Sequence, residues 1–93
     1  MPQIKREYPG KSAQEIYEKV DAVMERLAGK MGLHYDKNPS ERTGKVSKMG
    51  ISGSYTASEG AVDVDLHFPF LVPASMKKKV QDDIERRLDG LFA

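Results

Sequence analysis

The segment from Val46 to Pro73 constrains the fold of this chain more than any other part of the sequence. From Val62 to Phe68 apolar and polar residues alternate strictly, the apolar ones being Val62, Val64, Leu66 and Phe68 and the polar ones Asp63, Asp65 and His67. Such alternation is typical of a β-strand with one buried face and one solvent-exposed face. The sequence therefore predicts a sheet that is covered on one side only.

Length and composition limit the class of protein. A chain of 93 residues predicts one domain, 1–93, that can bury a core without metals or disulfides. It contains no Cys, which excludes disulfides, thiolate metal sites and cysteine nucleophiles. Fifteen basic and fourteen acidic residues leave the chain nearly neutral, which argues against a general nucleic-acid binder. Because no signal peptide or membrane span is apparent, we expect a cytoplasmic, bacterial-type protein.

The first predicted helix runs from about Ala13 to Met31. Ser12 and Glu15 have the spacing of a capping box at its start, and Gly32 suits the left-handed position after its end. Its apolar stripe consists of Ile16, Val20, Val23, Leu27 and Met31, flanked by Tyr17 and Met24.

The second predicted helix begins at Pro73, a residue that suits a first helical turn. Its apolar stripe consists of Met76, Val80, Ile84, Leu88 and Leu91. On the opposite face, the spacing of four residues predicts the ion pairs Asp82–Arg86 and Asp83–Arg87.

The remaining segments predict strands. Gln3 to Tyr8 is expected at a sheet edge, because Arg6 shares the inward parity. Leu33 to Lys37 is a second strand. From Thr43 to Ala57 the apolar phase changes, which indicates a bulge at Gly50 or, as we prefer, a turn near Lys48 to Gly50 between two strands. A hairpin loop at Ser58-Glu59-Gly60 then leads to the strand Ala61 to Phe68.

These elements predict an α+β fold of order β-α-β-β-β-β-α. We expect an antiparallel sheet of four to five strands with both helices side by side on one face. The other face would carry polar residues, namely Ser52, Ser54, Thr56, Asp63, Asp65 and His67.

The apolar connector after the Ala61–Phe68 strand gives the strongest functional hint. Its side chains cannot all point inward from so short a segment, and exposed apolar patches tend to mark contacts. The candidate contact patch consists of Phe68, Phe70, Leu71, Val72 and Phe92. It would serve a homodimer, a hydrophobic granule or a lipid-like ligand. The alternative is a connector folded over the sheet end and capped by Leu91 and Phe92.

Other candidate residues have weaker support. Asp63, Asp65 and His67 could share an ion, since residues two apart on a strand lie about 7 Å from each other, but a solvated strand face explains them better. The run Lys77 to Lys79 suggests an anionic partner or, as we prefer, a solvated face. The tyrosines that could line a cavity for a small apolar ligand are Tyr17, Tyr35 and Tyr55. No motif predicts catalytic residues, a metal site or a cofactor.

Several short motifs, in order, cover nearly the whole chain. They are I-x-R-x-Y (Ile4, Arg6, Tyr8), L-A-x-K-x-G (Leu27, Ala28, Lys30, Gly32), G-x-x-G (Gly50, Gly53), V-x-V-x-L (Val62, Val64, Leu66) and I-E-R-R-L-D (Ile84 to Asp89). In these motifs and their spacing the chain resembles the small polyhydroxyalkanoic acid system proteins, also described as polyhydroxyalkanoate granule-region proteins. It departs from the family pattern at Tyr35 to Pro39, where family members often carry an aromatic and acidic motif that includes Trp.

The resemblance implies a setting beside polyhydroxyalkanoate storage genes and no catalytic residue. Our first hypothesis is therefore a non-enzymatic accessory protein that binds polyhydroxyalkanoate granules or their proteins through apolar contacts. The second is a helix-grip domain that binds a small acyl-type ligand between sheet and helices. The third, an enzyme acting on hydroxyacyl esters, has the least support.

Overall fold

The computed structural model describes residues 3–48, 50–69 and 71–92 and confirms the predicted order of elements. The strands are β1 (Gln3–Glu7), β2 (His34–Asn38), β3 (Thr43–Lys48), β4 (Ile51–Ser58) and β5 (Ala61–His67), and the helices are α1 (Ala13–Met31) and α2 (Ala74–Asp89). The five strands form one antiparallel sheet in the order β1-β5-β4-β3-β2. The predicted first strand does lie at an edge, beside β5.

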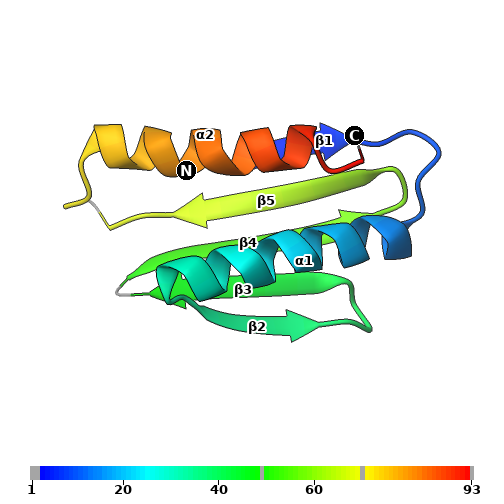
Figure 1. The fold of residues 1–93 in the computed structure, drawn as a ribbon, viewed down its shortest axis with the longest axis horizontal. Helices are drawn as coiled ribbons and strands as arrows, with labels where there is room; N and C mark the ends of the chain where they lie inside the picture. Colours follow the sequence, from blue (N-terminus) through cyan, green and yellow to red (C-terminus); the bar gives the residue numbers. More distant parts are fainter. Residues whose placement is uncertain (1–2, 49, 70, 93) are drawn as a thin grey trace.

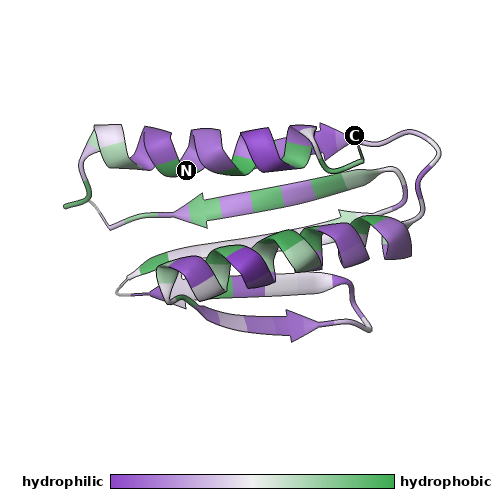
Figure 2. Cartoon of the chain, in the orientation of Figure 1, coloured by the Kyte–Doolittle hydropathy of each residue, from purple (hydrophilic) through white to green (hydrophobic). Residues whose placement is uncertain are grey.

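Both helices pack on the same face of this sheet and run in opposite directions (Figure 1). α1 contacts β2 to β5, whereas α2 lies along β1. The core combines the inward residues of the central strands with one stripe of each helix. The alternation in β5 is visible as bands of opposite hydropathy (Figure 2), and Val62, Val64 and Leu66 are buried. The one-sided sheet that the sequence predicts is therefore confirmed.

α1 has the bounds that its caps predict. The Ser12 hydroxyl accepts a hydrogen bond from the Glu15 amide, and the Glu15 side chain accepts from the Ser12 amide, so both partners of the capping box are in place. Gly32 ends the helix in the left-handed region with φ 69°. The predicted stripe needs one correction. Met24 is buried at its centre, whereas Met31 at its end is 44% exposed.

Two turns set the phase of the central strands. β3 and β4 are separate strands, joined by a turn at Gly50 with φ 87°, so the preferred alternative to a bulge is confirmed. Met49, within this turn segment, lies outside the described residues. Glu59 and Gly60 form the next turn, where Gly60 has φ 72°. Together the turns place Gly53, Tyr55 and Ala57 on the inner face of β4.

α2 is attached to the sheet by its C-terminal half. Ile84 and Leu88 are buried there. From β1, Arg6 Nε donates to Asp89 Oδ1 at 2.6 Å and Arg6 Nη2 donates to Glu85 Oε1 at 3.2 Å. The Tyr8 hydroxyl donates to the Leu88 carbonyl at 2.7 Å. These contacts fix the end of α2 that lies beside β1.

The N-terminal half of α2 is less well covered. Met76, which the apolar stripe predicts to be in the core, is 49% exposed, and Val80 is only half-buried. The ion pairs also differ from the predicted set. Asp83 pairs with Arg87 as predicted, but the partner of Asp82 is Lys78, at 3.3 Å, rather than Arg86. Arg86 instead pairs with Asp83.

Gly44 on β3 is required by the ring of Tyr55 on the neighbouring strand. A Cβ atom added at Gly44 would lie 2.7 Å from Tyr55 Cζ, and Tyr55 is buried. We therefore expect Gly44→Ala to lower the free energy of unfolding by about 1–3 kcal/mol through overpacking. Gly29→Ala is the control, because no atom lies within 4 Å of its added Cβ on α1. It should raise stability by about 0.5–1 kcal/mol. Chemical denaturation measures both changes, and a neutral Gly44→Ala would contradict the packing argument.

Candidate functional site

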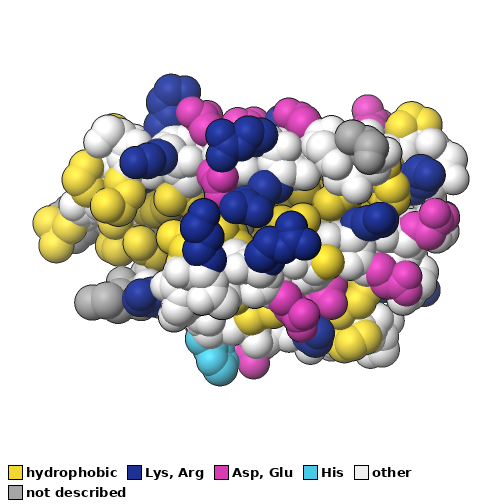
Figure 3. Space-filling view, viewed as in Figure 1, with side chains coloured by type: hydrophobic (Ala, Val, Ile, Leu, Met, Phe, Trp, Pro, Cys, Tyr) yellow, Lys and Arg dark blue, Asp and Glu magenta, His cyan; other side chains and the backbone are white. Residues whose placement is uncertain are grey.

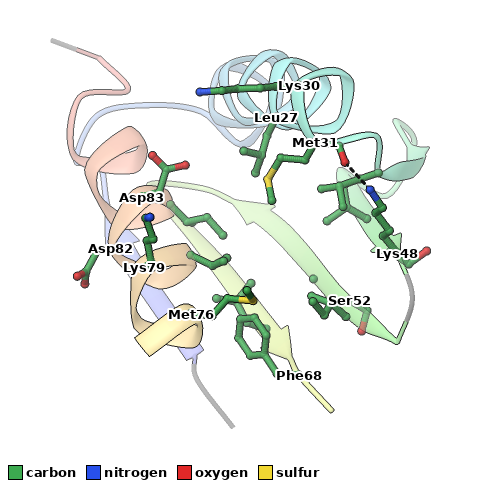
Figure 4. Close-up of a pocket in the computed structure, with 18 of the residues that line it drawn as sticks. Leu27, Lys30, Met31, Lys48, Ser52, Phe68, Met76, Lys79, Asp82 and Asp83 are labelled. Atoms are coloured by element: carbon green, nitrogen blue, oxygen red, sulfur yellow. Dashed lines mark hydrogen bonds between the residues drawn. The ribbon is translucent and has the colours of Figure 1, made fainter. Parts of the chain in front are cut away.

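A groove opens between the two helices, at the end of the molecule where α1 finishes and α2 begins. Its volume is about 550 Å³, which falls in the range of roughly 300–1,000 Å³ that small-molecule sites occupy. We call it the interhelical groove. It lies over the sheet between the C-terminal half of α1 and the N-terminal half of α2 (Figure 4).

Apolar side chains form most of the interhelical groove. Leu27 and Met31 line it from α1, and Met76, Val80 and Ile84 line it from α2. The strands beneath contribute Val46, Gly53 and Leu66, and Phe68 lies at the end of β5. In Figure 4 the labelled apolar side chains Leu27, Met31 and Met76 point into the space between the helices. The groove therefore exposes the side-chain types that bury well against a hydrocarbon chain.

Gly53 keeps the floor of the groove at the level of the backbone. It lies on the inner face of β4, where its neighbours Tyr55 and Ala57 carry side chains. A Cβ added at Gly53 would lie 3.2 Å from Leu66 Cδ2 and 3.5 Å from Val46 Cγ2. A side chain at this position would thus occupy the space above these two residues, and its absence deepens the groove.

Charged side chains surround the opening. Four basic and two acidic residues line the groove, namely Lys30, Lys48, Lys79, Arg86, Asp82 and Asp83. Lys48 Nζ donates to the last carbonyl of α1, that of Met31, at 3.0 Å. Partial burial opposes ionisation of Asp83, but hydrogen bonds from Arg87 and Arg86 outweigh it and lower the pKa of its carboxyl group. Both groove carboxylates are therefore engaged by cations of α2 itself.

The large hydrophobic side chains that are exposed in the described part of the chain gather at this same end. Leu71 in the connector is 79% exposed, Met76 is 49% exposed and Met31 is 44% exposed. Figure 3 shows hydrophobic side chains clustered where β5 ends and α2 begins, with Lys and Arg side chains over the seam between the helices. The groove is thus continuous with an apolar surface.

The structure divides the predicted contact patch. Phe68 lines the groove and Leu71 is exposed beside it, while Val72 is half-buried. Phe70 lies outside the described residues. Phe92 lies at the opposite end of α2, where its ring packs edge-on against Tyr8 with a centroid distance of 5.1 Å. The alternative in which Leu91 and Phe92 cap the connector is therefore wrong, because α2 carries them to the other end of the sheet.

The tyrosines predicted to line a cavity lie in or beside the core, outside the groove. Tyr17 and Tyr55 are buried, with their ring centroids 6.2 Å apart. The Tyr35 hydroxyl donates to Asp21 Oδ1 at 2.7 Å and lies 2.6 Å from the Tyr55 hydroxyl. None of the three is among the residues that line the interhelical groove. Their role in binding a ligand stays a prediction, and the contacts show a hydrogen-bond network.

The polar face of the sheet carries Asp63, Asp65 and His67 as predicted. Asp63 pairs with Lys5 at 3.7 Å, and Asp65 and His67 are exposed. His67 is the cross-strand neighbour of Ser52. Within residues 3–48, 50–69 and 71–92, no group of three or more His, Asp or Glu residues is arranged to hold a metal ion. In the same ranges no helix is long and apolar enough to cross a bilayer.

Sequence reasoning missed the groove itself, because each apolar stripe was assigned to the core along its full length. Two signals were present in the sequence. Methionines stand at the outer end of each stripe, at Met31 and Met76, and flexible Met side chains are frequent at adaptable binding surfaces. A lysine run also surrounds Lys79, close to a helix N-terminus where cations are unfavourable.

Three comparisons with known proteins bear on the chain. The family model described as "Putative polyhydroxyalkanoic acid system protein (PHA_gran_rgn)" matches residues 3–92. No curated protein matches the sequence. The structure is similar to the crystal structure of a TBP-like protein from Parabacteroides distasonis ATCC 8503, with a TM-score of 0.59 and 16% identity over 70% of this chain. The match spans 51% of that protein's length, and at this identity it shows a shared fold alone.

The tyrosine network predicts a loss of stability in alkaline solution. Burial raises the pKa of Tyr55 to about 12, and burial with the hydrogen bonds to Tyr55 and Asp21 also raises the pKa of Tyr35. Their unfolded pKa is about 10, so the unfolded chain ionises first as pH rises. The free energy of unfolding should fall between about pH 10 and 12. Chemical denaturation across this range should show a shallower fall for Tyr55→Phe than for the parent, and equal slopes would contradict the network.

Proposed function

The chain belongs to the family of polyhydroxyalkanoic acid system proteins, and we propose that it is a non-enzymatic binding protein of that system. In this proposal the interhelical groove holds an apolar, acyl-type chain such as a hydroxyacyl unit. The observation that carries the proposal is the groove itself, an apolar space of about 550 Å³ between helices and sheet. A helix-grip ligand binder would hold its ligand between sheet and helices, as this groove could, but Tyr17, Tyr35 and Tyr55, the residues predicted to line that cavity, do not line the groove.

The chemistry of the groove suits such a chain. Burying one methylene group contributes about 0.8 kcal/mol, and the groove offers aliphatic and thioether side chains on both walls and an aliphatic floor. A polyhydroxyalkanoate unit combines an alkyl side chain with an ester group, so most of its surface gains from this environment. The family name supports the same class of ligand.

Binding without catalysis is the reading that the groove favours. Hydrolysis or transfer of an ester would need an activated nucleophile or a convergent acid–base pair beside the bound chain. The described residues that line the groove include neither His34 nor His67. Its carboxylates, Asp82 and Asp83, accept hydrogen bonds from cations of α2. These groups stabilise the helix that forms one wall.

Filling the groove tests the proposal. Val80 is half-buried and lines the α2 wall, so Val80→Trp should occupy the space that the ligand needs. We expect it to weaken binding of methyl 3-hydroxydecanoate, a neutral ester resembling one polymer unit, by about tenfold or more. Isothermal titration calorimetry measures the change.

The matched control is Val23→Trp, which places the same side chain at a half-buried valine of α1 outside the groove. It should leave the dissociation constant unchanged. Equal weakening by both variants would indicate a general loss of structure, and binding of neither methyl 3-hydroxydecanoate nor its free acid by the parent chain would overturn the proposed function.

A second candidate function is adsorption to the surface of a polyester granule. It is favoured by the position of Leu71, which is 79% exposed beside the groove and does not line it. Together with the exposed Met31 and Met76 it extends the apolar surface beyond the groove.

Leu71→Asp separates the two functions. A charge at the most exposed apolar position should reduce co-sedimentation with polyhydroxyalkanoate granules severalfold, because the carboxylate would be desolvated on contact. It should leave the affinity for methyl 3-hydroxydecanoate unchanged. Ser54→Asp on the exposed polar side of β4 is the control. If Leu71→Asp and Ser54→Asp sediment as the parent does, granule adsorption through this surface is wrong.

A further inference from the structure

We propose that the acyl chain bound in the interhelical groove ends in a free carboxylate, which Lys30 and Lys79 hold at the rim while the alkyl part lies over Leu66 toward Phe68. This inference rests on the proposed function and specifies its ligand. The ligand class is a free hydroxy acid or fatty acid. An ester and the polymer surface both lack the anionic end that the two lysines would bind.

The charges around the groove carry the argument. Its acidic residues are already neutralised, because Asp82 pairs with Lys78 at 3.3 Å and Asp83 pairs with both Arg86 and Arg87. Lys48 is committed to the carbonyl of Met31. Lys30 and Lys79 are different, since neither ammonium group has a hydrogen bond or ion pair to any residue in the described part of the chain.

The two lysines stand on opposite walls of the same opening. Lys30 extends from α1 toward α2, where Asp83 and Lys79 project at the rim (Figure 4). The space-filling view shows Lys and Arg side chains concentrated over the seam between the helices (Figure 3). A ligand carboxylate at this rim would find an ammonium group on each wall, beside an Asp83 that Arg86 and Arg87 already pair, while its alkyl chain enters the apolar space below.

Physical chemistry favours this occupant over a neutral one. Hydrogen bonds between ammonium and carboxylate groups are charge-assisted and roughly twice as strong as neutral ones. A neutral chain would cover Lys30 and Lys79 without providing acceptors of comparable strength, and covering a charge without a partner is costly.

The test compares 3-hydroxydecanoate with its methyl ester, two ligands that share the alkyl chain and the hydroxyl group and differ in the anionic end. Isothermal titration calorimetry should give a dissociation constant for the carboxylate that is lower by about tenfold. In Lys30→Glu/Lys79→Glu the preference for the carboxylate over the ester should disappear. The parent's preference should also shrink in 0.5 M NaCl, because salt screens exposed charges.

The control is Lys19→Glu/Lys45→Glu, which changes the net charge equally at two exposed lysines that do not line the groove. It should keep the preference. If the double glutamate variant does not fold, as judged by circular dichroism, Lys30→Gln/Lys79→Gln replaces it and should likewise abolish the preference.

Each outcome has a distinct meaning. Equal affinity of the parent for the acid and the ester, with both lost in Val80→Trp, overturns the carboxylate inference and leaves the proposed function standing. A preference that survives in Lys30→Glu/Lys79→Glu assigns the anion to other residues and also overturns it. Binding of neither ligand by the parent overturns the proposed function together with the inference.

Discussion

The attachment of α2 at one end is the constraint on which the rest of the structure depends. Arg6 and Tyr8, from β1 and the residue after it, hold the C-terminal turns of α2 through Asp89, Glu85 and the Leu88 carbonyl, and the apolar stripe is fully buried only there. α1 is packed over the other strands, centred on β4. Because each helix takes its position from different strands, the two separate at the end away from β1. The groove is the space that this separation leaves.

An unfilled apolar space costs stability, so its presence in a chain of 93 residues calls for a reason. A larger residue at Val80 would occupy it, and a Cβ at Gly53 would enter it only by crowding Leu66 Cδ2 at 3.2 Å. A site that must accept a ligand has to keep such positions small, which is the usual conflict between binding and stability. The contrast within α2 fits this view. Ile84 and Leu88 are buried for stability, whereas Met76 remains exposed at the groove.

Local signals in the sequence were sufficient for the elements and for the one-sided sheet. The capping box at Ser12, the left-handed Gly32 and the turn at Gly50 each act over a few residues, so they can be recognised without tertiary information. The groove depends on how far two helices diverge, which no short-range pattern encodes. The apolar stripe predicted that Met31 and Met76 face the sheet side, but it could not show that both remain about half exposed there. The prediction that Phe68 and Phe92 belong to one patch failed for the same reason, because their separation follows from the length and direction of α2.

The rim charges decide which of the candidate ligands the molecule is built for. A neutral polyester surface would gain from Leu71, Met76 and the apolar groove, but it would have to cover Lys30 and Lys79 without pairing them. A carboxylate-ended chain uses the same apolar residues and supplies the missing acceptor. The sequence already contained this distinction in the lysines at 77–79, which we first explained as a solvated face. Lys78 fits that explanation, because it pairs with Asp82 on the helix. The ammonium group of Lys79 has no such partner among the described residues, and it lines the groove opposite Lys30, where a ligand carboxylate would supply the anion.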